Sequence, residues 1–115
     1  MQLGYIGGHG RNDLFSRVGS QATQGSSVDF GQFGVQQFSR FTGLIRPDSV
    51  GATGLTFRWR MGINSGAFQV SSSVTVGSGG AAFDQFNYGR FADFSFTSID
   101  STTTFGIVIL GEPLR

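Results

Sequence analysis

The side chains that could carry out chemistry are few in this chain of 115 residues. It has a single histidine, His9, and no cysteine, which excludes a metal site built on two histidines or on thiolates. No lysine is present to complete a phosphate-binding loop, and no Gly-x-Ser-x-Gly nucleophile elbow occurs. The glycine-rich segment Gly77–Gly80 is not followed by Lys-Ser/Thr, so it predicts a flexible connection.

Three carboxylates, Asp84, Asp93 and Asp100, lie near one another in the sequence. A glycosidase needs two carboxyl groups facing each other across a sugar-sized cleft, for which a chain this short has little room. A calcium loop would show an Asp-x-Asp pattern, and none occurs. We therefore expect Asp93 to pair with an arginine on a neighbouring strand. The sequence predicts no catalytic residue, no metal and no cofactor, hence a protein that is not an enzyme.

The basic residues are all arginine, and the net charge is only +1. Phosphate neutralisation needs a basic excess, so a nucleic-acid partner is not expected. Arginine without lysine is typical of protein interfaces, although codon bias in a high-GC genome would give the same composition. Arg58 and Arg60 flank Trp59 in a predicted strand. They form either a docking surface or a solvated face opposite a buried tryptophan.

The clearest element is a predicted hairpin over Leu55–Val76. Hydrophobic residues alternate with polar ones in both of its arms, which is the pattern of half-buried strands. Asn64-Ser65-Gly66 supplies a turn whose glycine can take a positive φ. The residues expected on the buried face are Leu55, Phe57, Trp59 and Met61 in the first arm, and Phe68, Val70, Val74 and Val76 in the second.

Further strands are expected on both sides of this hairpin. One runs from Val28 to Val35 with a bulge near Gly31 or Gly34, and a second covers Phe38–Arg46 before the turn residues Pro47-Asp48-Ser49. Arg90–Ile99 alternates again. Phe105–Leu110 is apolar on both faces, so it should be covered on both sides or lie in a subunit contact. Six to eight strands with turns every 8–12 residues predict an all-β fold, an antiparallel β-sandwich that is jelly-roll-like.

Aromatic residues without a clean period fill the segment 81–89, the least regular one of the chain. Phe83, Phe86 and Tyr88, with Arg90 just beyond, have three open interpretations. They could belong to the core, form a hydrophobic patch buried between subunits, or make an aromatic platform for sugar rings.

The first 27 residues differ in composition from the rest. They are rich in glycine, with a possible short helical turn over 11–18 and a linker-like stretch over 19–27. We therefore divide the chain into an N-terminal arm, 1–27, and a β-sandwich domain, 28–115. A weakly hydrophobic terminus must be tied down to be ordered, so either it packs along its own domain or a neighbouring subunit holds it. We expect the neighbouring subunit to hold it, through Tyr5, Ile6, Leu14 and Phe15.

Neither a secretory signal nor a membrane partner is expected. The chain start lacks a charged segment followed by an apolar one. No apolar run approaches the ~20 residues of a membrane-spanning helix.

A small β protein without cysteine or lysine, with the arm Met1–Ser27, the apolar strand Phe105–Leu110 and the tail Gly-Glu-Pro-Leu-Arg, resembles small virion structural proteins of tailed bacteriophages. The resemblance is to the head-decoration, capsid-stabilising type. It implies a subunit made in the host cytoplasm and located in the virion. It also implies a homo-oligomer, often a trimer, which clamps a major capsid or other virion protein.

Two alternatives to capsid decoration remain. One is a phage tail or fibre component, or a subunit of another extracellular filament. The other is a small carbohydrate-binding module.

Overall fold

The computed structural model describes residues 12–113 and, within them, all side chains except those of residues 12, 13, 15, 17 and 20. The described residues form strands and turns without a helix. Eight strands follow one another along the chain: β1 (Asn12–Ala22), β2 (Val28–Gly34), β3 (Phe38–Pro47), β4 (Leu55–Gly62), β5 (Val70–Val76), β6 (Ala81–Phe86), β7 (Phe91–Ile99) and β8 (Thr103–Pro113).

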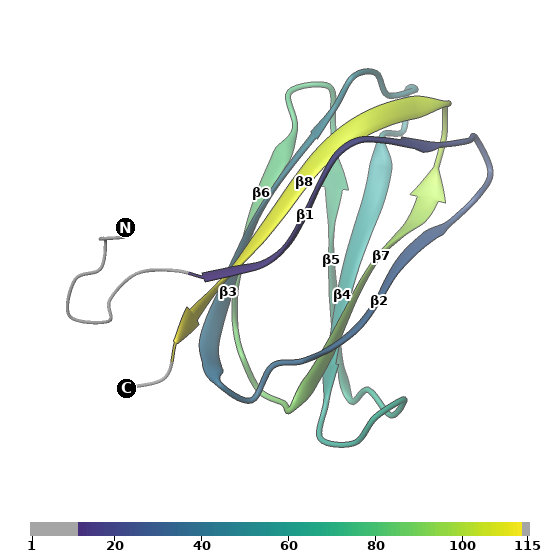
Figure 1. The fold of residues 1–115 in the computed structure, drawn as a ribbon. Helices are drawn as coiled ribbons and strands as arrows, with labels where there is room; N and C mark the ends of the chain where they lie inside the picture. Colours follow the sequence, from purple (N-terminus) through teal and green to yellow (C-terminus); the bar gives the residue numbers. More distant parts are fainter. Residues whose placement is uncertain (1–11, 114–115) are drawn as a thin grey trace.

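The strands form two antiparallel sheets that lie face to face (Figure 1). Sheet A has the order β1-β8-β3-β6 and sheet B the order β2-β7-β4-β5. Strands therefore pair as β4 with β5, β3 with β6, β2 with β7 and β1 with β8, as in one long antiparallel ribbon with its tip between β4 and β5. Rolling this ribbon adds the contacts of β3 with β8 and of β4 with β7. This arrangement is a jelly roll, and the predicted fold class is confirmed.

The predicted hairpin is the tip of this ribbon, and β4–β5 is the one pair of consecutive strands that shares a sheet. Gly66 has a φ of +77° in its turn, and Asn64 bridges Ala67, as the sequence predicts. One predicted core residue is wrong. β5 begins only at Val70, and Phe68 lies on the outer face of sheet B, where the Arg60 guanidinium sits 4.7 Å from its ring centre.

The segment 12–22 contradicts two further predictions, because it forms β1 instead of a helical turn and a linker. It pairs with β8 along its whole length, Leu14 packs against the core and Ala22 is buried. A helix cap contributes only about 1 kcal/mol, whereas pairing with β8 satisfies a row of backbone groups. Residues 12–22 therefore belong to the sandwich. The expected arm is left with residues 1–11, which lie outside the described residues.

Phenylalanine fills the space between the sheets. Phe57 is fully buried and contacts the rings of Phe83, Phe94 and Phe96, with centroid distances of 5.3–6.3 Å. Trp59 of β4 stacks on Phe83 of β6 at 4.3 Å. Its indole Nε1 donates a hydrogen bond of 2.9 Å to the side-chain oxygen of Gln85. An aromatic cluster with one satisfied polar group thus joins sheet B to sheet A.

At one corner of the sandwich, Asp100 joins two connections that pass from one sheet to the other. One connection links β7 to β8 and the other links β3 to β4. Its carboxylate accepts hydrogen bonds from the Gly51 amide (2.9 Å), the Thr53 amide (2.8 Å) and the Thr53 hydroxyl (2.7 Å). The hydroxyl bond is the main cause that lowers the pKa of Asp100, and the backbone amides add to it. The ionised form is therefore the one that closes this corner.

We expect Asp100→Asn to change how stability depends on pH. Because the folded-state pKa lies below the unfolded value of about 3.9, the stabilising contribution is complete above pH ~4 and is lost as the pH falls through the lowered value. The thermal midpoint of the wild type should exceed that of the variant at pH 6, and the two should converge at lower pH. A difference that stays constant down to pH 2 would contradict this role of the carboxylate.

Candidate interaction surface

The outer face of sheet A is apolar at its centre. Side chains alternate between the two faces of a strand, and in this sheet the odd-numbered residues of β6, of β8 and of β3 from Phe41 onward point into the core. Leu44 of β3 lies across from Val108 of β8 and from Ala82 of β6, Thr42 lies across from Leu110, and Arg46 across from Gly106. We call the following residues the apolar patch: Val18, Leu44, Ala82, Val108 and Leu110.

Much of the apolar patch is exposed. Val18 is 89% and Leu44 61% exposed, Ala82 is exposed, and Val108 and Leu110 are half-buried by their neighbours in the sheet. Two hollows of about 600 and 410 Å³ share Leu44, Ala82 and Val108 in their lining. The strand Phe105–Leu110 is predicted to be covered on both sides or to lie in a subunit contact. Its inner face packs in the core, while its outer face has no covering layer among the described residues. Coverage of both sides within the chain is therefore not found there, and a subunit contact stays a prediction.

Charged residues of both signs border the apolar patch. Arg40 and Asp84 form an ion pair across β3 and β6, with Arg40 Nε 2.6 Å from a carboxylate oxygen. Hydrogen bonding to Asp84 raises the pKa of Arg40, and the charge of Glu112, its register partner on β8, acts in the same direction. Arg46 lies at the other end of β3. An apolar centre with a polar, charged rim is the anatomy of a protein interface.

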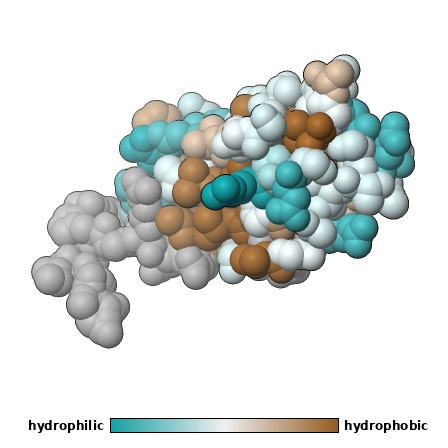
Figure 2. All heavy atoms as spheres, turned by 90° about the horizontal axis from the view of Figure 1, so that it is seen from above, coloured by the Kyte–Doolittle hydropathy of each residue, from teal (hydrophilic) through white to brown (hydrophobic). Residues whose placement is uncertain are grey.

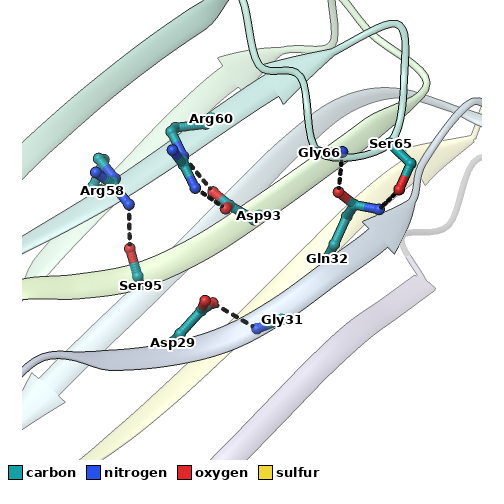
Figure 3. Close-up of polar contacts among 9 residues, drawn as sticks. All are labelled: Asp29, Gly31, Gln32, Arg58, Arg60, Ser65, Gly66, Asp93 and Ser95. Atoms are coloured by element: carbon teal, nitrogen blue, oxygen red, sulfur yellow. Dashed lines mark hydrogen bonds and ion pairs between the residues drawn. The ribbon is translucent and has the colours of Figure 1, made fainter.

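The outer face of sheet B is polar instead (Figure 3). Arg60 of β4 points at Asp93 of β7, and their side chains form two hydrogen bonds of 3.0 and 2.5 Å. Asp93 is buried, and its predicted pairing with an arginine of a neighbouring strand is confirmed. Arg58 reaches Ser95 at 3.4 Å. These two arginines, predicted as docking residues, lie side by side on one face, but Arg60 is engaged within its own chain.

The aromatic residues predicted as one cluster lie in different surroundings. Phe83 is a core residue, stacked on Trp59, so its place among the surface candidates is wrong. Phe86 is exposed at the end of β6, with the Arg40 guanidinium 5.4 Å from its ring centre. Tyr88 is also exposed and lines a hollow of about 400 Å³ with Arg90.

The candidates from the N-terminal segment lie only partly within the described residues. Tyr5 and Ile6 lie outside the described residues. Leu14 packs against the core of its own chain. The backbone of Phe15 pairs with Ile109, and its side chain is outside the described part. Contact of these residues with a neighbouring subunit stays a prediction.

The sequence alone did not single out Val18, Leu44 and Ala82 of the apolar patch. Leu44 lies in a predicted strand, but the run Phe-Thr-Gly-Leu-Ile does not say which face Leu44 takes. Gly43 decides it, because its position lies on the inner face and the Phe83 ring occupies the place of a side chain there. Val108 and Leu110 are the part of the patch that the sequence does indicate, since they make the last strand apolar on its outer face as well.

Residues 12–113 contain no group of three or more His, Cys, Asp or Glu side chains close enough to hold a metal ion. The same residues include no helix of the length and apolarity needed to cross a membrane.

Hydrophobic residues gather at the surface on the side of the molecule seen in Figure 2, with hydrophilic residues beside them.

Comparison with known proteins gives no family. No family model matches the chain, and no curated protein matches its sequence. Among solved structures, the chain is similar to one from a study of Bacillus endospore appendages, which describes them as a novel family of disulfide-linked pili. The identity is 12%, the TM-score is 0.48, and each chain is covered completely. A likeness at this level carries no argument about function.

Proposed function

We propose that the protein is a non-enzymatic structural subunit that assembles with copies of itself through the outer face of sheet A. The observation that carries this proposal is the exposed apolar patch with its charged rim. Burying apolar surface contributes roughly 25 cal/mol per Å², so covering the patch in an assembly stabilises it. Sheet B, whose outer face is polar, is the side that remains in water.

The open strand edges support the same function. A sandwich exposes the edges of its outermost strands, here β1 and β6 of sheet A and β2 and β5 of sheet B. Natural proteins protect such edges with charges, particularly lysine, and with proline. β5 has the sequence Val-Ser-Ser-Ser-Val-Thr-Val, without a charge or a proline. An edge of this composition favours contact with a partner.

The particle to which the subunit belongs is proposed from the sequence resemblance. It is a phage head, where the protein decorates or cements the capsid as a homo-oligomer, with a trimer as the implied state. A phage tail or fibre, or another extracellular filament, is the alternative. Cosedimentation of the protein with purified heads, tails or filaments from its source separates these locations.

Self-association is tested by analytical ultracentrifugation of the purified protein between 1 µM and 1 mM. We expect the weight-average sedimentation coefficient to rise with concentration as copies associate. A protein that sediments as a monomer over the whole range would contradict self-assembly.

A second candidate function, sugar binding, is favoured by the surroundings of Tyr88. Its exposed ring lines a hollow whose polar groups include Gln36, Asn87 and Arg90, and an aromatic face beside hydrogen-bonding groups suits a sugar ring. Titration with a panel of oligosaccharides tests it. Saturable binding by a monomeric protein that is lost in Tyr88→Ala would favour this function over assembly.

A further inference from the structure

The charges around the apolar patch are arranged unequally along the strands. Arg40 and Glu112 face each other across β3 and β8 at one end of the patch. At the other end, Arg46 lies across from Gly106, so a cation has no acidic register partner on β8 there. Between the two ends, Leu44 lies across from Val108 and Thr42 from Leu110. This order of residues determines how a second copy can dock.

We propose that two copies pack the outer faces of their sheets A together about a two-fold axis that runs parallel to the strands, between β3 and β8. This inference rests on the proposed function, assembly of the protein with itself through this surface, and gives that contact two-fold symmetry in place of the trimer that the sequence resemblance implies. The axis places β3 of one copy against β8 of the other. Each residue of β3 then faces, in the second copy, the residue that is its register partner on β8. Leu44 then faces Val108 of the second copy, and Arg40 faces its Glu112. Both contacts occur twice, as two-fold symmetry requires.

The other in-plane axis, perpendicular to the strands, would place β3 against β3 in opposite directions and bring Arg40 of one copy over Arg46 of the other. Arg40 is already paired with Asp84 of its own chain, so this contact is less unfavourable than one between two lone cations, but it sets no opposite charges face to face. The parallel axis instead gives two arginine–glutamate contacts at the rim.

The dimensions of the face agree with a weak, specific pair. Four strands at ~4.8 Å and four side-chain rows at ~6.8 Å give about 500 Å² per copy, or roughly 1,000 Å² for the pair. That is the lower limit of specific interfaces, the size range of weak and transient contacts. Packed sheets cross at about 30°. Opposing residues of the two copies are therefore aligned most closely near the axis, where β3 and β8 lie.

Two charge-reversal variants, measured alone and then mixed, test this geometry. Arg40→Glu and Glu112→Arg are each made in the full chain. Alone, each variant would bring two like-charged pairs together across the axis, so we expect each to associate at least tenfold more weakly than the wild type. Mixed in equal amounts, the two variants would form two opposite-charge pairs. We therefore expect the mixture to associate at least tenfold more tightly than either variant alone.

Mixing leaves every contact within a chain unchanged, so a gain on mixing reports only contacts between copies. A wild type that dimerises, with a mixture that associates no more tightly than its components, would overturn the axis and leave self-assembly standing. A wild type that is monomeric at 1 mM would overturn the proposed function itself. Leu44→Asp with Val108→Arg, mixed in the same way, repeats the test if Arg40→Glu does not fold.

Discussion

Replacing Phe57 by alanine is expected to lower the free energy of unfolding by about 3–5 kcal/mol. Phe57 is fully buried at the centre of the aromatic cluster and contacts rings from both sheets. Its removal leaves a cavity that neighbouring strands cannot close, because they are fixed by their ladders. A domain of this size is stable by only about 5–15 kcal/mol, so the variant should be close to unfolding at 37 °C.

The measurement is urea-induced unfolding followed by tryptophan fluorescence, since Trp59 contacts the mutated side chain. Phe86→Ala is the matched control, because it removes the same side chain from an exposed position. We expect it to change stability by less than about 0.5 kcal/mol. Equal effects of the two substitutions would contradict the assignment of the core.

The second large effect is expected from Arg60→Ala. This substitution removes the partner of Asp93, a buried carboxylate, and also the guanidinium that covers Phe68. Breaking a fully buried ion pair costs about 3–5 kcal/mol. Arg60 keeps part of its surface in water, so we expect a loss of about 2–4 kcal/mol.

The Arg40–Asp84 pair on the other sheet is the natural comparison. Both of its side chains are more exposed than those of Arg60 and Asp93. Exposed pairs contribute about 0–1 kcal/mol, so Arg40→Ala should cost less than about 1 kcal/mol in a dilute, monomeric sample. Unfolding experiments at 1 µM compare the two. Equal losses would mean that the burial of Asp93 does not control the stability of its pair.

Local patterns predicted the parts of the fold where one strand face is apolar and the other polar. Leu55–Gly62 and Phe91–Ile99 show this alternation, and both are strands of sheet B. The predicted inner residues of the first, Leu55, Phe57, Trp59 and Met61, are buried. The glycine turn at Asn64-Ser65-Gly66 gave the hairpin. From these elements the sandwich class followed, and with it the pairing of Asp93 with an arginine of a neighbouring strand, which is Arg60 in the structure.

Patterns failed where a distant strand decides the structure. The segment 12–22 has few core residues of its own, and it becomes a strand because β8 offers it an edge to pair with. Phe68 fits the alternation of the following strand, but the turn continues past it and leaves its ring over Arg60. Phe83 and Phe86 are three residues apart, so on the strand β6 they point to opposite faces.

The candidate surface was only half predictable for the same reason. The second apolar face of Phe105–Leu110 was visible in the sequence. Leu44, Ala82 and Val18 join it only because β3, β6 and β1 lie in one sheet with β8 in this order. No local pattern contains that order, since it results from rolling the whole ribbon.

The central claim is that the protein assembles through the outer face of sheet A. Sedimentation velocity of Leu44→Asp, compared with Ile63→Asp, tests it most directly. Both substitutions put a carboxylate in place of an exposed aliphatic side chain, but Ile63 lies in the turn between β4 and β5, outside this face. We expect Leu44→Asp to sediment as a monomer at 100 µM and Ile63→Asp to associate like the wild type. Association of Leu44→Asp equal to that of the wild type would contradict it.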